Sequence, residues 1–265
     1  MIKLILADGC SAISGVEQAD YCEWKDDPRG KNIEYSEHTW PALLWKEKYP
    51  TAIYYPTAKS GSSNMGIARR INFYVNKFIK EGYLPNEMLV CIQWSNLDRI
   101  EFSRSETHQS KNTSEFNYED LNPVYIYGPA PNNRNWLIYN NFQKIIKPLY
   151  KHHYLLNDTL YYSYKEIEAT NNLLNLYNIK NYQSAAFESL FYNPVKTNDF
   201  LNDLIERNQK LIHREYNKGN KKHKLGFFEY CWKYLDKEHV GPGSHPLLAG
   251  HQLWYTKIKQ WYNIE

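Results

Sequence analysis

Two segments near opposite ends of the chain carry the residue types of nucleophilic acyl transfer. Ser11 lies in the small-residue turn ADGCSAISG, between Gly9 and Gly15, and such a turn leaves room for a substrate beside a projecting hydroxyl. His245 stands before a proline in the segment GPGSHPLLAGH. A serine hydroxyl becomes a useful nucleophile when a neutral imidazole takes its proton. Taken alone, Ser11 is better explained as a residue that caps the following segment.

Two further loops offer hydrogen-bond donors for the negative charge that develops in acyl transfer. AKSGSSNMG, residues 58–66, is a Gly and Ser loop that opens a helix, and its free backbone N–H groups can bind an anion. QWSNLDR, residues 93–99, places the carboxamide of Asn96 just beyond an apolar run. A hydroxyl, amide N–H groups and a carboxamide therefore meet if these loops share one edge of the fold.

Apolar periodicity predicts the elements that must position these loops. Two nearly continuous apolar runs, 2–7 and 88–94, are typical of parallel strands covered on both faces. Weaker β-type runs cover 51–55 and 182–187. Helical patterns with caps or one apolar face cover 39–49, 64–82 and 159–178.

Alternation of strands and helices predicts a single α/β domain over residues 1–265, with a three-layer α/β/α architecture and a flavodoxin-like parallel sheet. Ligands of such sheets bind in the crevice at the carboxyl ends of the strands. The polar, poorly periodic segment 103–135 is expected to be a loop-rich insertion near that crevice.

The order of four short motifs resembles the SGNH, or GDSL-like, hydrolases, and in particular the bacteriophage-type variants that carry GCS in place of GDS. The motifs are GCS at 9–11, SGSSN at 60–64, WSN at 94–96 and HPLLAGH at 245–251. The resemblance implies that Ser11 is the nucleophile and His245 the base. It also implies that the Ser11 N–H, the Gly61 N–H and the Asn96 side chain form the oxyanion hole.

One departure from the family pattern concerns the acid that orients the histidine. The family places an aspartate two or three residues before the histidine, where this chain has Gly243 and Pro242. Three explanations are open: a main-chain carbonyl of 241–243 holds the imidazole, Asp236 or Glu238 folds back to it, or the site has lost its activity. We expect the carbonyl, because a Gly-Pro-Gly segment can turn tightly beneath the ring.

The expected function is a serine hydrolase of carboxylic esters on small molecules or glycans, with glycan O-deacetylation as one candidate reaction. The alternative is a catalytically degenerate glycan- or protein-binding module on the same scaffold, and a phage structural or accessory protein is a third reading. His251, on the apolar stripe of the last helix, is expected to be a packing residue.

Composition argues against several other classes. The 265 residues carry 32 basic and 29 acidic side chains without a basic stripe, so no nucleic-acid partner is expected. The four cysteines form no C-x-x-C pair, and His108 and the histidines at 152–153 lack ligand spacing, so we expect no metal and no other cofactor. The apolar N-terminus is too short for a signal peptide or membrane span. A cytoplasmic location, including the cytoplasm of a phage-infected cell, is expected; the oligomeric state is not indicated.

Overall fold

The computed structural model describes residues 1–21, 35–97, 99–102, 124–126, 156–191, 199–217 and 220–265. Most of the segment predicted as an insertion, 103–135, lies outside the described residues, as do Cys22, His108 and the histidines at 152–153. Within that segment the structure describes only strand β5 (Val124–Ile126), which pairs antiparallel with β4 (Ile100–Phe102).

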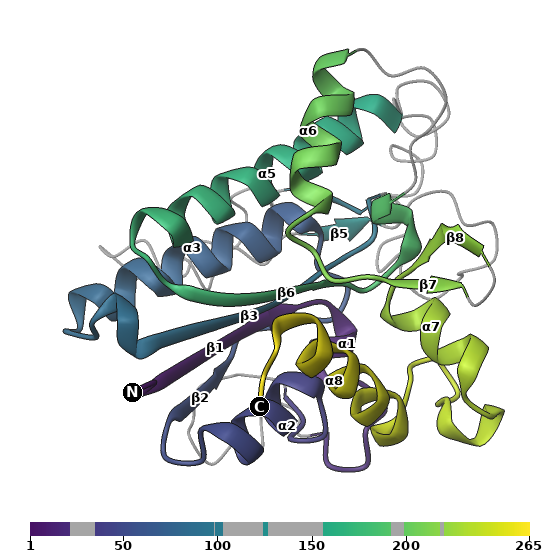
Figure 1. The fold of residues 1–265 in the computed structure, drawn as a ribbon, viewed down its shortest axis with the longest axis horizontal. Coiled ribbons are helices and arrows are strands. Elements are labelled where there is room, and N and C mark those ends of the chain that lie inside the picture. The colour runs from purple at the N-terminus through teal and green to yellow at the C-terminus, as the bar shows by residue number, and fades with distance from the viewer. Residues whose placement is uncertain (22–34, 98, 103–123, 127–155, 192–198, 218–219) are drawn as a thin grey trace, which may run out of the picture.

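The central sheet has four parallel strands in the order β2-β1-β3-β6 (Figure 1). Their bounds are Leu4–Gly9 for β1, Ile53–Pro56 for β2, Met88–Trp94 for β3 and Lys180–Ala185 for β6. Every residue of β1 and β3 is buried, as two covered faces require of a central parallel strand. All four strands were predicted from the apolar runs.

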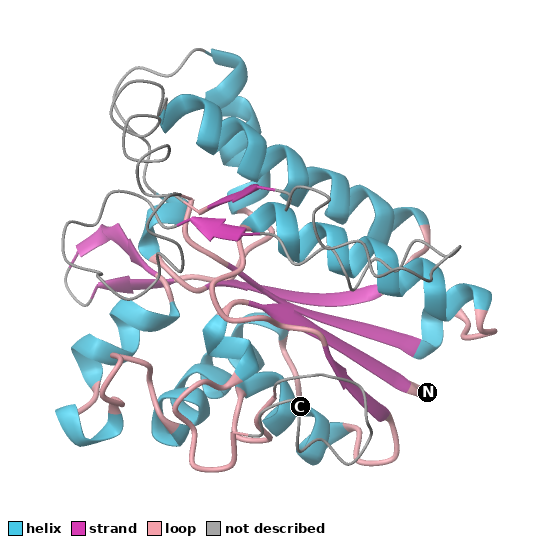
Figure 2. Cartoon of the chain, turned by 180° about the vertical axis from the view of Figure 1, so that it is seen from behind, coloured by secondary structure: helices cyan, strands magenta, loops and turns pink. Residues whose placement is uncertain are grey.

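Helices cover both faces of the sheet (Figures 1 and 2). One layer contains α3 (Asn64–Lys80), α5 (Leu156–Leu176) and α6 (Asp199–Gln209). The opposite layer contains α2 (Trp40–Lys48), α7 (Phe227–Tyr234) and α8 (Leu248–Tyr262). Two hydrophobic cores follow, one on each side of the sheet. The predicted three-layer α/β/α architecture is confirmed.

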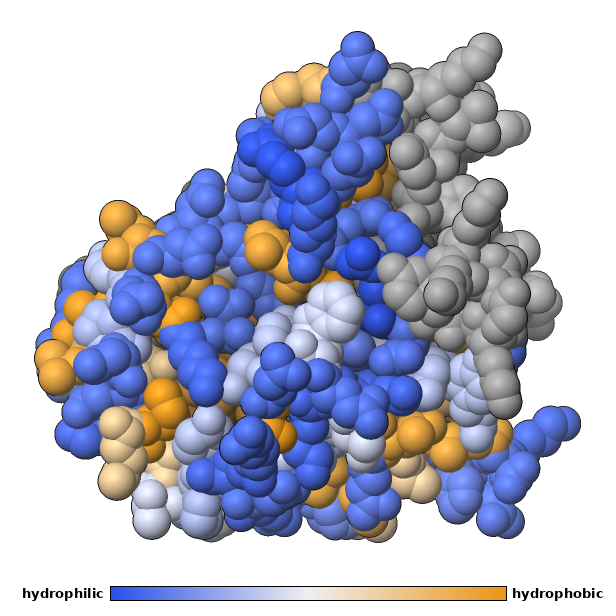
Figure 3. All heavy atoms as spheres, in the orientation of Figure 1, coloured by the Kyte–Doolittle hydropathy of each residue, from blue (hydrophilic) through white to orange (hydrophobic). Residues whose placement is uncertain are grey.

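Shorter elements complete the described chain. They are α1 (Ser11–Ser14), the antiparallel pair β7 (Glu215–Asn217) and β8 (Asn220–Leu225), and the 3₁₀ turns η2 (Pro85–Glu87), η4 (Glu188–Phe191) and η5 (Lys237–His239). The exposed large apolar residues are dispersed along the chain, and the face in Figure 3 is largely hydrophilic with apolar residues scattered over it. Such scattered residues are normal on a folded protein.

The strand order fixes the position of the site. From β1 the chain passes first to β2 on one side and later to β3 on the other, so the order reverses between β1 and β3. A crevice opens outside the carboxyl ends of the strands at such a point. Ser11 follows the end of β1 and Asn96 follows the end of β3. The topology therefore brings both candidate residues to the same edge.

Candidate active site

The turn that carries Ser11 is built from backbone hydrogen bonds. Ser11 is the first residue of α1, and its carbonyl accepts from the N–H groups of Gly15 at 3.0 Å and Val16 at 3.2 Å. Gly15 closes the helix with a φ of 80°, and a Cβ there would lie 2.3 Å from the Cβ of Ser36. Cys10, not Ser11, is the N-cap residue, and no side chain caps this helix. The Ser11 hydroxyl therefore has no capping role.

The loop that carries His245 is closed on itself. The Gly241 N–H donates to the His245 carbonyl at 2.8 Å, and the Ser244 N–H donates to the Gly241 carbonyl at 2.9 Å. Ser244 has a φ of 71°, and its carbonyl accepts from the Trp232 indole at 2.8 Å. Pro246 does not begin α8, which starts two residues later at Leu248. Instead Pro246 pairs with Val240 in an antiparallel bridge.

The partner of the His245 ring is Glu17. Oε2 of Glu17 lies 3.1 Å from Nδ1 of His245 and 3.2 Å from the His245 N–H, and Oε1 accepts from the Gly243 N–H. Glu17 stands six residues after Ser11 and has a φ of 71°, which directs the chain back from α1. Beside it, Nε2 of Gln18 donates to the Pro246 carbonyl at 2.8 Å. These contacts join the Ser11 segment to the His245 segment across 228 residues of sequence.

Glu17 occupies the position beside the imidazole that was expected for a main-chain carbonyl of 241–243, Asp236 or Glu238. The Gly241 carbonyl accepts instead from Ser244. Asp236 is the N-cap of η5, and the 78% exposed Glu238 side chain lies 3.7 Å from the ring of His239. The carboxylate comes instead from the turn that follows α1.

Glycines at 241 and 243 make room for this carboxylate. A Cβ at Gly243 would lie 2.4 Å from Oε1 of Glu17, and a Cβ at Gly241 would lie 2.4 Å from Oε2. Real Cβ atoms do not approach another heavy atom so closely, so a side chain at either position displaces the carboxylate. The same Gly-Pro-Gly segment that lacks an acid is the socket for one. In the sequence, the two glycines around a proline indicated a tight turn here. No motif or spacing in the sequence indicated that Glu17 would be the acid.

Burial keeps the His245 imidazole in its neutral form. Burial lowers the pKa of His245 below its ordinary 6.5, the Glu17 carboxylate raises the pKa in part, and the Arg99 guanidinium lowers it further. The ring of Phe228 packs edge-on against the imidazole with centroids 5.6 Å apart. A carboxylate only accepts hydrogen bonds, so Nδ1 carries the proton and Nε2 keeps its lone pair. This tautomer is the one that a general base requires.

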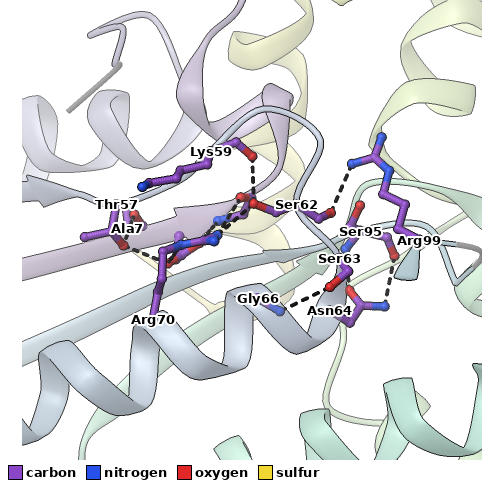
Figure 4. Close-up of polar contacts among 12 residues, drawn as sticks. Ala7, Thr57, Lys59, Ser62, Ser63, Asn64, Gly66, Arg70, Ser95 and Arg99 are labelled. Carbon is purple, nitrogen blue, oxygen red and sulfur yellow. Dashed lines mark hydrogen bonds and ion pairs between the residues drawn. The ribbon is translucent and has the colours of Figure 1, made fainter. Parts of the chain in front are cut away.

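The two loops predicted to hold oxyanion donors are fastened to each other (Figure 4). Gly61 has a φ of 79°, and Ser63 caps α3 by accepting from the Gly66 N–H at 3.2 Å. The Asn64 side chain accepts from the Ser95 N–H at 2.7 Å and donates to the Ser95 carbonyl at 3.3 Å. Asn96 is the next residue, so the start of α3 fixes the backbone that leads to it.

His251 is a packing residue, as the helical stripe predicted. Its side chain is 1% exposed, its Nδ1 accepts from the Trp40 N–H at 3.2 Å, and its ring lies 4.8 Å from that of Phe227. Burial lowers its pKa to about 3. Cys10, the residue before Ser11, is a buried free cysteine.

Neither a metal site nor a membrane span is found in the described part of the chain. No three His, Cys, Asp or Glu side chains among those residues are grouped so that they could hold a metal ion. Of the helices described here, none combines the length and the apolar character that crossing a bilayer requires.

No family model matches the chain, and no curated protein matches its sequence. Solved structures similar to it include LAE5, an alpha/beta hydrolase enzyme from the metagenome of Lake Arreo, at 12% identity and a TM-score of 0.44 over 97% of this chain and 94% of that one. A member of the lipolytic protein G-D-S-L family from Veillonella parvula has 10% identity and a TM-score of 0.43 over 99% and 100% of the two chains. The psychrotrophic esterase EstA from Pseudoalteromonas sp. has 12% identity and a TM-score of 0.43 over 98% and 99%.

Proposed function

We propose that the protein hydrolyses carboxylic esters with Ser11 as nucleophile, His245 as general base and Glu17 as the acid that orients His245. The observation that carries the proposal is the 3.1 Å contact between Oε2 of Glu17 and Nδ1 of His245. It supplies the member of a Ser-His-acid triad that the sequence lacks before the histidine. Triads are defined by geometry and not by sequence position, so an acid from the turn after α1 is chemically equivalent.

The proposed reaction proceeds through an acyl-enzyme. Nε2 of His245 takes the Ser11 proton as Oγ attacks the ester carbonyl, and the resulting oxyanion is held by the N–H groups of Ser11 and Gly61 and by the Asn96 carboxamide. Collapse expels the alcohol, which takes the proton from His245. Water then attacks the acyl-enzyme while His245 accepts its proton, and the carboxylic acid leaves with Ser11 restored.

The rival function, a degenerate binding module, depended on the missing acid. Glu17 removes that reason, because its carboxylate contacts the His245 ring. The N–H groups of Gly243 and His245 also donate to this carboxylate and hold it in place. The Nδ1 atom of the partly buried imidazole is paired with a carboxylate, as a general base requires. The resemblance to bacteriophage-type variants rests on the sequence Gly9-Cys10-Ser11 alone. The proposed chemistry does not depend on that resemblance.

For the substrate, we favour an ester on a glycan, with acetyl as the acyl group. Trp232 carries an indole ring that is 44% exposed, and its N–H donates to the carbonyl of Ser244, the residue before His245. The indole also packs against Phe228, which touches the imidazole. The indole N–H is thus bonded within the protein, while part of the ring surface is exposed to solvent near the site. Aromatic faces of this kind suit the apolar face of a sugar ring.

Turnover of short-chain aryl esters and acetylated saccharides tests this function, with Ser11→Ala beside the unaltered protein. The substitution is expected to remove turnover, and a fluorophosphonate probe is expected to label Ser11 alone. Cys10→Ala is the matched control, because Cys10 is the adjacent buried nucleophile and its removal should leave turnover nearly intact. Equal turnover by the Ser11→Ala protein would exclude Ser11 as the nucleophile.

A further inference from the structure

Arg70 of α3 connects the end of β1 to the loop that carries Gly61 (Figure 4). Its Nε donates to Oδ2 of Asp8 at 2.9 Å, and its Nη2 donates to Oδ1 of Asp8 at 2.6 Å. The same Nη2 reaches the Gly9 carbonyl at 3.3 Å and the Ser62 hydroxyl at 2.9 Å. One guanidinium therefore holds the strand end two residues before Ser11 and the loop residue after Gly61.

Asp8 is a buried acid that fixes the guanidinium. Its side chain is 0% exposed, and it also accepts from the Gly9 N–H at 2.6 Å and the Thr57 hydroxyl at 2.7 Å. A bidentate pair with a carboxylate sets the plane of the guanidinium as well as its distance. Because Asp8 belongs to β1, which is paired with a strand on each side, Arg70 is anchored to the centre of the sheet.

Ser62 is held from both of its ends. Its hydroxyl accepts from Arg70 and donates to the Lys59 carbonyl at 2.8 Å, while its own carbonyl accepts from Nη1 of Arg99 at 3.1 Å. Gly61 immediately precedes it in the left-handed conformation, with a φ of 79°. The Gly61 N–H belongs to the peptide that precedes Gly61, and the contacts of Ser62 hold the chain immediately after it, so they limit the directions in which that donor can point.

We infer that Arg70, through Ser62, is a positioning residue that sets the spacing between the Ser11 and Gly61 N–H groups. The inference rests on the proposed function, in which these two groups bind the oxyanion. Hydrogen bonds stabilise an oxyanion only when the donors already stand about 3 Å from the place where it forms. Misplacement by about 1 Å costs on the order of 100-fold in rate. A guanidinium anchored in β1 keeps the loop at the required distance.

Ser62→Ala tests the link without disturbing the Asp8–Arg70 pair. The substitution removes one hydroxyl from a fully buried position and leaves the buried charges paired. We expect kcat for an aryl acetate to fall by about 10- to 100-fold with KM within about threefold, since the interaction is made only with the transition state. The rate at which a fluorophosphonate labels Ser11 should fall by a similar factor, because its phosphoryl oxygen occupies the same hole.

Thr57→Val is the matched control. It removes a buried hydroxyl that donates to Oδ2 of Asp8 at 2.7 Å, while Arg70 and Ser62 remain in contact. If the Arg70 contacts with Asp8 and Ser62 serve stability alone, both variants lose thermal stability and keep the kcat of the unaltered protein. If Arg70 positions the loop, both lose stability and only Ser62→Ala loses kcat. Ser62→Cys, which preserves the side-chain size with a weaker acceptor, is expected to behave as Ser62→Ala does and provides the test if the alanine variant does not fold.

The outcomes separate this inference from the function on which it rests. Turnover that depends on Ser11 but is unchanged by Ser62→Ala or Ser62→Cys overturns the positioning role and leaves the proposed hydrolase standing. Absence of any Ser11-dependent turnover in the unaltered protein overturns both. Loss of kcat in the Ser62 variants, with KM retained and Thr57→Val unaffected in kcat, supports both.

Discussion

The Glu17 carboxylate occupies the space that a side chain at Gly243 would fill, since a Cβ there would lie 2.4 Å from Oε1. Gly243 also donates its N–H to that same oxygen. Gly243 therefore accommodates the Glu17 carboxylate in two ways: it has no side chain to fill the space, and its backbone N–H donates a hydrogen bond. The position where the SGNH-like motif pattern would place the orienting aspartate here accepts an acid from elsewhere in the chain.

Glu17→Gln is expected to lower kcat by about 10²- to 10⁴-fold with little change in KM, because a neutral partner stabilises the developing imidazolium less and can select the wrong tautomer. Glutamine preserves the size of the side chain and one acceptor, so the fold should persist. Steady-state kinetics on an aryl acetate measures the loss. The double variant Asp236→Asn/Glu238→Gln is the control, and a larger loss in that protein than in Glu17→Gln would return the role to one of those acids.

We expect kcat/KM to fall as the solution is made more acidic, with an inflection below pH 6.5. Burial lowers the pKa of His245 from that ordinary value, and the base works only when unprotonated, so activity is retained until the pH falls through the lowered pKa. Removing the Glu17 charge removes an influence that raises this pKa. Glu17→Gln should therefore move the inflection to lower pH still. An inflection above 6.5, or a shift to higher pH in the variant, would contradict this electrostatic account.

Gly243→Ala is expected to lower kcat by at least about tenfold, because the new methyl group displaces the Glu17 carboxylate from the imidazole. Gly82→Ala is a suitable control. Gly82 has a φ of 96° with open space around it, so alanine there strains the backbone without touching the site. The control should lose stability and keep kcat.

Placing an aspartate at position 243, where the resembled motif pattern carries one, by Gly243→Asp is expected to lower activity in the unaltered background. The new carboxylate would meet that of Glu17, and two like charges at such a distance repel. In a Glu17→Ala background the same graft has space, and it should recover part of the activity that Glu17→Ala loses. Comparing kcat across the four proteins of this cycle measures the coupling between the positions. Higher activity in the single Gly243→Asp variant would show that Glu17 does not fill the socket.

The sequence predicted the frame of the molecule better than the contacts within the site. The β1 and β3 runs were recognisable because burial on both faces demands continuous apolar residues. The helices α6 and α7 were not predicted; they have 11 and 8 residues, and helices of this length gain most of their stability from packing against neighbours.

Glu17 escaped prediction for a related reason. Local spacing governs which side chains share a helix face or a strand, but the Glu17–His245 contact spans 228 residues and depends on a left-handed residue and two glycines. The strand ends could be placed at one edge from topology. Which acid then faces the imidazole is decided by the path of two loops, and no periodicity records that path.

The buried His251 is expected to make the protein less stable in acid. Its pKa in the folded state is lowered to about 3 from an ordinary 6.5, so the unfolded chain binds the proton more readily between these values. Its contribution to the free energy of unfolding is therefore complete above about pH 6.5 and is lost as the pH falls toward 3, at up to about 1.4 kcal/mol per pH unit.

His251→Asn keeps an acceptor for the Trp40 N–H and removes the titration. Urea unfolding between pH 7 and pH 4.5 should show a shallower loss of unfolding free energy in this variant, with His239→Asn, a substitution of a more exposed histidine, as the control. Parallel slopes in His251→Asn and the unaltered protein would mean that His251 takes up no proton on unfolding, and the acid sensitivity would then belong to other groups.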